Sequence, residues 1–140
     1  EFIRYLPAEN YKTSGVNIRF GPFLIKNNPS ATANRRYEGL TFSGNVYVLT
    51  GVSTFSSAMD FALYLSDNGL AKIIGETPGN MPSSYGDILR FQTPNARLAF
   101  TVSYKYFTRP DSSKNDLPLV PDVGVPASSA MDTALWMIVR

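Results

Sequence analysis

A strand, a helix and a second strand follow one another within residues 46–75. Residues 46–50 are a short, β-branched apolar run bounded by glycines, which is typical of a strand covered on both faces. From Thr54 the apolar residues recur every three to four positions as far as Asn68-Gly69, which predicts an amphipathic helix. Residues 71–75 are predicted to form a second buried strand. Parallel strands need such a helical crossover, so the order predicts a βαβ unit and an α/β fold.

Local signals set the expected ends of this helix. Ser53 or Thr54 can accept hydrogen bonds from its first amides, and Asn68-Gly69 supplies the left-handed stop that commonly follows a last turn. Further elements are expected on both sides of the unit. They are one or two strands over 16–25, a mobile loop at 27–34, a β-hairpin of 87–91 with 98–106, and a C-terminal helix over 129–139 capped by Ser128 or Ser129.

The length of 140 residues predicts a single domain, and 44% apolar residues are enough for a core. The chain has no cysteine and no histidine. It therefore lacks disulfides, thiolate metal sites, the commonest metal ligand and the commonest general base. No ligand set for a metal or a cofactor is visible, and we expect neither. Any catalysis within these residues must use Ser, Thr, Lys, Tyr or carboxylates.

The charge and hydropathy patterns exclude some classes of partner. A formal net charge of +2 is too small to predict binding to nucleic acid, which we do not expect. No apolar run approaches the eighteen or so residues of an integral membrane segment, and the first residues do not resemble a signal peptide.

A serine cluster lies where the first buried strand passes into the helix, within 50–57. In open α/β sheets ligands bind beside the carboxyl ends of strands, where a helix N-terminus offers free amides and partial positive charge. A serine in the first turn could act as a nucleophile, with the next amide binding an oxyanion. The alternative is a simple helix cap, and the nucleophile-elbow motif is not matched because Phe55 stands where that motif has glycine.

Five short segments, in this order, carry a resemblance to a known family. They are Val46-Tyr47-Val48-Leu49-Thr50, the run from Thr54 to Ala62, Ile73-Ile74-Gly75-Glu76-Thr77, Tyr85-Gly86-Asp87 and Pro121-Asp122-Val123. Together they resemble the C-terminal half of the catalytic domain of the tail-specific, or C-terminal processing, serine peptidases and their tricorn-like relatives. The resemblance covers residues 44–140, whereas residues 1–43 match only loosely.

The resemblance implies a ClpP/crotonase-like α/β fold, here partial, and hydrolysis of peptide bonds through an acyl-serine intermediate. It implies that Ser56 is the nucleophile, that the Ser57 amide is half of the oxyanion hole, and that Asp116, with Asp111 as a second choice, is the acidic residue. Substrate contacts are expected at Gly75, Glu76 and Thr77. Peptide or protein substrates and a location outside the cytoplasm, in the periplasm, the cell envelope or the medium, are also implied.

The chain departs from the family pattern in its base. Residues 77–84 contain no lysine, Lys72 is one strand too early, and there is no histidine. The family's Gly-Gly oxyanion strand is also missing. Three interpretations stay open: the C-terminal part of a longer peptidase domain whose base lies elsewhere, an inactive member that binds extended peptides, or an unrelated α/β binding module. We favour the first, because a serine without a base is a poor nucleophile.

Overall fold

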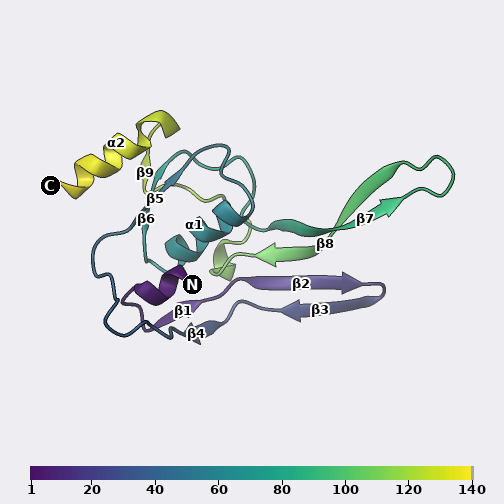
Figure 1. Ribbon diagram of the computed structural model, residues 1–140, viewed down its shortest axis with the longest axis horizontal. Coiled ribbons are helices and arrows are strands. Elements are labelled where there is room, and N and C mark those ends of the chain that lie inside the picture. The colour runs from purple at the N-terminus through teal and green to yellow at the C-terminus, as the bar shows by residue number, and fades with distance from the viewer. Residues whose placement is uncertain (140) are drawn as a thin grey trace.

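The strand–helix–strand unit forms the centre of the computed structural model, which describes residues 1–139 (Figure 1). Strands β5 (Tyr47–Thr50) and β6 (Lys72–Gly75) pair in parallel, and helix α1 (Ser57–Asp67) connects them. Strand β9 (Val123–Gly124) pairs in parallel with the other side of β6, so the sheet order is β5-β6-β9. The predicted α/β class and βαβ unit are confirmed.

Both faces of this parallel sheet are covered by helices. Successive side chains of a strand point to opposite faces, and Ile73 and Ile74 of β6 are both fully buried. Ile73 packs against α1, and Ile74 packs against helix α2 (Ala127–Ile138). Burying two isoleucine side chains stabilises the sheet by roughly 1.5–3 kcal/mol each. The contacts on α1 are Met59, Ala62 and Leu63, and those on α2 are Ala130 and Ala134.

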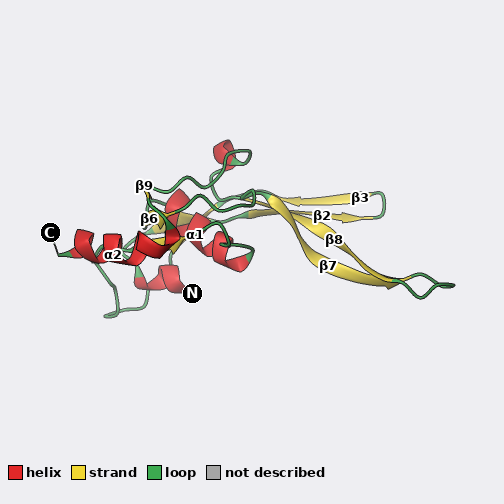
Figure 2. Cartoon of the chain, turned by 90° about the horizontal axis from the view of Figure 1, so that it is seen from above, coloured by secondary structure: helices red, strands yellow, loops and turns green. Residues whose placement is uncertain are grey.

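Two hairpins form a second, antiparallel sheet that projects from this body (Figures 1 and 2). The first hairpin is β2 (Gly15–Phe20) with β3 (Phe23–Asn27), and the second is β7 (Ser84–Gln92) with β8 (Ala99–Thr108). β2 and β8 pair along the middle, which gives the order β3-β2-β8-β7. The strands expected over 16–25 and the hairpin at 87–106 are therefore both present.

The loop expected at 27–34 contains a short strand. β4 (Ala31–Ala33) pairs with β1 (Asn10–Lys12) in an antiparallel ribbon. Its small and polar residues indicate a loop when they are considered locally, but a partner about twenty residues upstream supplies the ladder. The remaining short elements are the 3-10 turns η1 (Phe2–Tyr5) and η2 (Ser112–Lys114).

The predicted helix ends are right at one terminus and wrong at others. Asn68 caps the C-terminus of α1 and Gly69 adopts a φ of 65°, as expected. The first residue outside its N-terminus is Ser56, not Ser53 or Thr54. Thr54 instead accepts a hydrogen bond from the Gly51 N–H at 3.0 Å, which closes the preceding turn.

Helix α2 also begins earlier than expected, because Pro126 lies at its N-cap and neither Ser128 nor Ser129 does. The fixed φ of a proline suits the entry of the chain into a helix. Within residues 1–139, no helix has the length and apolar character needed to cross a membrane.

Candidate active site

The turn between β5 and α1 forces Ser56 into an unusual backbone conformation. Its φ is 54° and its ψ is −126°, a combination that glycine adopts easily and other residues rarely. Such strain costs on the order of 1–3 kcal/mol and persists only where the surrounding structure holds it. Residues with this kind of strain cluster at functional sites.

The end of β6 and the loop after it hold this turn in place. The Glu76 carboxylate accepts a hydrogen bond from the Val52 N–H at 3.2 Å, and the Gly79 N–H donates to the Val52 carbonyl at 3.0 Å. The Thr50 hydroxyl donates to the Glu76 carbonyl at 2.9 Å, while the Glu76 N–H donates to the Thr50 carbonyl at 3.0 Å. These hydrogen bonds hold residues 50–52 against residues 76–79.

Gly75 allows the two strand ends to approach this closely. A Cβ atom at this position would lie 2.0 Å from the Thr50 carbonyl oxygen, and the φ of Gly75 is 131°. Only glycine satisfies both conditions. The apolar run 71–75 therefore ends in glycine because a side chain there would clash with β5.

Ser56 and Ser57 present a free hydroxyl and a free amide at the start of α1. Within residues 1–139, no hydrogen bond engages the Ser56 hydroxyl or the Ser57 N–H. The first amides of a helix have no partner within the helix, and the macrodipole adds partial positive charge there. If the serine hydroxyl beside this amide acts as a nucleophile, the amide N–H can donate a hydrogen bond to the oxyanion that develops.

Ser56 and Ser57 line a cleft of about 410 Å³ between the body and the projecting hairpins. Its walls come from the start of α1, from the loop before β7, and from β7 and β8. The other lining residues are Phe55, Met59, Asp60, Asn80, Pro82, Ser84, Tyr85, Gly86, Asp87, Ile88, Ser103 and Phe107. The predicted Tyr85-Gly86-Asp87 segment is therefore part of the same cleft as the serines.

The three predicted substrate contacts do not line this cleft. Gly75 and Glu76 lie behind the serine turn and make the contacts described above, and Thr77 is exposed next to them. Their role toward a substrate stays a prediction.

Asp116 is exposed in the loop that follows η2, and within residues 1–139 no bond joins it to Ser56. This loop is anchored by the buried Arg109, which forms a two-pronged ion pair with Asp67 and donates to the Leu117 carbonyl at 3.1 Å. Asp67 is the last residue of α1, so the anchor lies about 16 Å along the helix from Ser56. The acidic role of Asp116, or of Asp111, stays a prediction.

Asp60 is the cleft residue that the sequence did not single out. It follows Ser56 by four positions on α1, and a spacing of four on a helix that starts with a candidate nucleophile is the signal that could have found it. Burial raises the pKa of the Asp60 carboxyl above its ordinary value. No lysine or arginine lines the cleft, and within residues 1–139 no cluster of carboxylates is placed to hold a metal ion.

Comparison with known proteins identifies the family. The model of peptidase family S41 matches residues 10–125. A protein from Parabacteroides merdae that is assigned as a peptidase has a TM-score of 0.71 and 16% identity, over 98% of this chain and 45% of that one. The photosystem II D1 C-terminal processing protease has a TM-score of 0.56 and 14% identity, over 99% of this chain and 34% of that one.

This chain thus spans less than half the length of both structures. Among curated protein sequences none matches it significantly. The structural likeness confirms the predicted ClpP-like fold, and the family match confirms the predicted resemblance to the C-terminal processing peptidases. The chain belongs to peptidase family S41.

Proposed function

We propose that the gene product carrying this sequence is a serine-type endopeptidase of the tail-specific group and that Ser56 is its nucleophile. The observation that carries the proposal is the strained Ser56 backbone at the start of α1, with a free hydroxyl and the free Ser57 amide on one cleft. A helix cap alone would not need a left-handed φ, and Ser56 makes no side-chain capping bond. The interpretation of the serine cluster as a simple helix cap therefore does not account for Ser56.

The proposed reaction proceeds through an acyl-enzyme. The Ser56 hydroxyl oxygen attacks the carbonyl carbon of the scissile peptide bond, and its proton passes to a general base. The Ser57 N–H donates to the oxyanion of the tetrahedral intermediate. Collapse releases the amine product, which takes up the proton, and leaves an ester on Ser56. Water then hydrolyses that ester and regenerates the serine.

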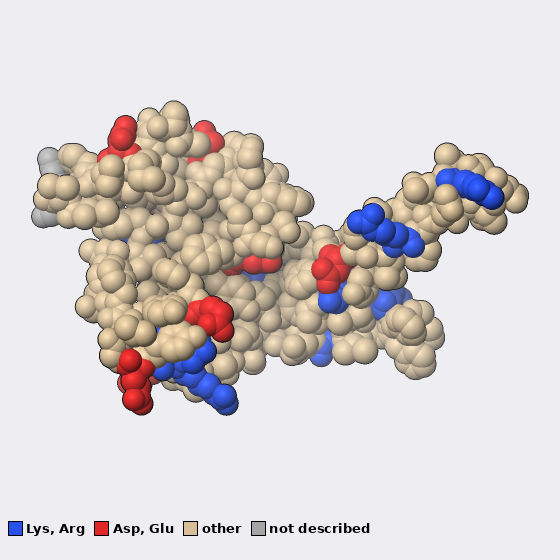
Figure 3. All heavy atoms as spheres, in the orientation of Figure 1, with Lys and Arg blue, Asp and Glu red and all other residues tan. Residues whose placement is uncertain are grey.

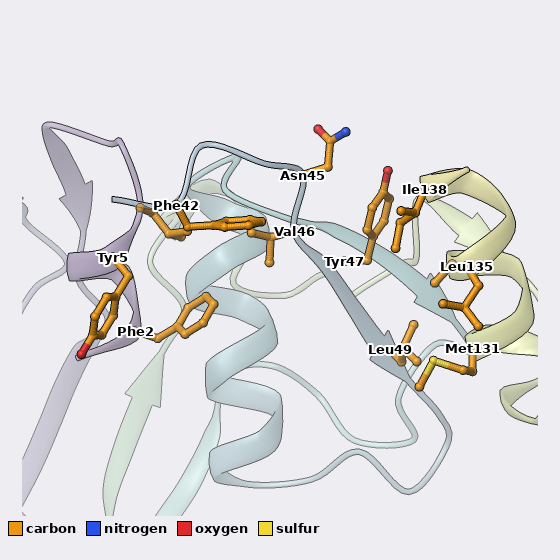
Figure 4. Close-up of a pocket in the computed structure, with 12 residues that line it drawn as sticks. Phe2, Tyr5, Phe42, Asn45, Val46, Tyr47, Leu49, Met131, Leu135 and Ile138 are labelled. Atoms are coloured by element: carbon orange, nitrogen blue, oxygen red, sulfur yellow. The ribbon is translucent and has the colours of Figure 1, made fainter. Parts of the chain in front are cut away.

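The general base is proposed to come from outside residues 1–140, because the cleft contains no lysine and the chain has no histidine. β5 is an edge strand of the parallel sheet, and its C-terminal end leads into the serine turn. An apolar pocket of about 480 Å³ lies along the same strand (Figure 4). Tyr47 and Leu49 point from β5 toward α2 in this pocket, and Phe42 and Val46 lie at its other end.

We propose that this open edge receives a further strand of the catalytic domain, which would bring the second oxyanion donor to the site. A free strand edge is a ready template for another strand. The proposal treats residues 1–140 as the C-terminal part of a longer catalytic domain, with residues 44–140 as its core and residues 1–43 matching the family only loosely. Its activity outside the cytoplasm is proposed from the family resemblance alone.

The second candidate function is binding of extended peptides without cleavage. It is favoured by one observation, the absence of any histidine, lysine or arginine from the lining of the cleft. The strand edge and the cleft would then serve only to hold a substrate chain.

Covalent labelling of the complete gene product tests the proposal. A fluorophosphonate probe should label the protein, and Ser56→Ala should remove at least 90% of the label. Ser53→Ala is the matched control, because Ser53 is an exposed serine of the same turn outside the cleft lining. Label that survives Ser56→Ala contradicts the assignment of the nucleophile. A folded protein that takes no label but binds extended peptides supports the second function.

A further inference from the structure

The cleft beside Ser56 has a charged group one helical turn away from the candidate nucleophile. The Asp60 N–H donates to the Ser56 carbonyl at 2.9 Å, which places the two residues at positions i and i+4 of one helix face. Both residues also line the same cleft. A group bound by the Asp60 carboxylate would therefore lie next to the reacting bond.

The Asp60 carboxylate has no cationic partner within residues 1–139. The other carboxylate of the cleft, Asp87, is paired with Lys105 at 2.6 Å. Arg4 lines a neighbouring hollow that Asp60 also borders, but its guanidinium donates to the Arg35 carbonyl at 2.7 Å and lies 3.9 Å from the ring centre of Tyr37. Asp60 thus has no ion-pair partner in the cleft; its side chain is solvent-exposed, and partial desolvation raises the pKa of its carboxyl.

The rest of the cleft suits a long aliphatic side chain. Several of its walls are apolar or aromatic, and Phe55 and Tyr85 are 67% and 70% exposed. Lysine and arginine lay their methylene stems along such surfaces while the charged head reaches a polar partner. Aromatic faces also attract cations. A glutamate side chain would meet the like charge of Asp60 in the same place.

We infer that Asp60 forms a specificity subsite for a lysine or arginine side chain of a peptide substrate. The inference rests on the proposed function, because Ser56 defines which peptide bond lies in the cleft. Asp60 is a binding residue in this proposal and takes no part in bond making. The substrate class is therefore peptides with a basic residue beside the scissile bond.

Matched peptides and variants of the complete gene product test this subsite. Fluorogenic peptides that differ only in lysine, norleucine or glutamate, moved stepwise along the sequence, should show a position where lysine exceeds norleucine in kcat/KM by about 10- to 100-fold, as expected for a charge-assisted hydrogen bond. Asp60→Asn should remove that preference and leave cleavage of the norleucine peptide within about threefold. Asp60→Lys should favour the glutamate peptide. Asp132→Asn, at an exposed acid of α2 outside the cleft lining, is the control that should keep the preference for lysine.

Two outcomes overturn the subsite. One is equal cleavage of the lysine and norleucine peptides at every position. The other is an equal loss for both peptides in Asp60→Asn, which would assign a structural or catalytic role to Asp60. If the protein takes no fluorophosphonate label, the same peptides are compared by fluorescence anisotropy. Equal binding of lysine and norleucine peptides then overturns the subsite, and tighter lysine binding that Asp60→Asn abolishes supports it, although the peptidase proposal has failed.

Discussion

Single residues at the carboxyl ends of β5 and β6 determine whether the candidate active site can form. The serine turn depends on a glycine behind it and on one carboxylate, and the two act in different ways. Gly75 removes a steric obstacle, whereas Glu76 supplies a hydrogen-bond acceptor. The first of these residues gives the sharper test, because its effect on stability follows from geometry alone.

Gly75→Ala should lower the free energy of unfolding by about 2–4 kcal/mol. The added Cβ would lie 2.0 Å from a carbonyl oxygen of the neighbouring strand, and the φ of 131° is strained for alanine. Gly124→Ala on the adjacent strand β9 is the matched control, since no atom lies within 4 Å of its added Cβ and its φ is not in the left-handed region. Urea unfolding of both variants measures the difference. Equal losses of unfolding free energy in the two variants would show that the close approach at Gly75 does not determine the stability.

Residue patterns predicted a serine cluster at the strand-to-helix boundary, and the family resemblance singled out Ser56 and Ser57, but neither predicted their geometry. A serine at a strand-to-helix boundary is visible in the sequence, whereas its left-handed φ occurs in a turn that is held by bonds from Glu76 and Gly79, twenty or more residues later. Asp60 was missed for a different reason. Its spacing of four from Ser56 could have drawn attention to it, but the lack of a cationic partner near its carboxylate can be seen only in the structure.

At the scale of elements, a buried ion pair links the end of α1 to the connection after β8. The Arg109 and Asp67 side chains are 3% and 0% exposed, and Arg109 also donates to two carbonyls of the loop that it holds. Lys114 lies 3.8 Å from Asp67 as a second, weaker partner. This loop leads to β9, so the pair sets the path of the chain toward the third strand of the parallel sheet.

Asp67→Asn should cost about 3 kcal/mol of unfolding free energy. It leaves the Arg109 charge buried without a full partner, and the removal of one member of a buried pair is much more costly than the loss of an exposed pair. Asp87→Asn is the control, because its pair with Lys105 is largely solvated and should contribute less than about 1 kcal/mol. Denaturant titration of the two variants checks this. A loss below 1 kcal/mol for Asp67→Asn would contradict the structural role of the pair.

The elements were predicted best where one period dominates a segment. The helical spacing of 54–69 and the apolar runs on both sides gave the βαβ unit and its parallel pairing. Helix starts and the β1–β4 ribbon were missed, because caps compete with turn contacts and a three-residue strand has almost no periodic signal. Those features depend on partners that are distant in the sequence.

Across the whole molecule, charge is divided between the body and the projecting sheet. The two hairpins, residues 15–27 and 84–108, carry Arg19, Lys26, Arg90, Arg97 and Lys105 against the single acid Asp87. They hold +4 of the formal charge, so the rest of the chain carries −2. Figure 3 shows Lys and Arg side chains along the hairpins on one face of the molecule. Lys26 and Arg90 lie on the two edge strands, where charge discourages pairing with other chains.

The far part of the second hairpin should be dispensable for the fold. Residues 88–92 and 99–103 pair only with each other, since β2 meets β8 only from Lys105 onward. Replacing residues 90–101 by Asn-Gly, which favours a two-residue hairpin turn, should shift Tm by less than about 3 °C. Circular dichroism melting measures this. A loss of more than about 8 °C would show that the hairpin tip stabilises the body.

The bonds that hold the serine turn have a consequence for how the site comes into being. Apart from the bond between Gly51 and Thr54, the hydrogen bonds described for residues 50–52 come from residues 76–79. The strained conformation of Ser56 can therefore be held only after β6 has paired with β5. Local detachment of residues 76–79 from residues 50–52 would therefore relax Ser56 before the rest of the body unfolds. The chemical reactivity of one hydroxyl thus becomes a reporter of whether the parallel sheet is assembled.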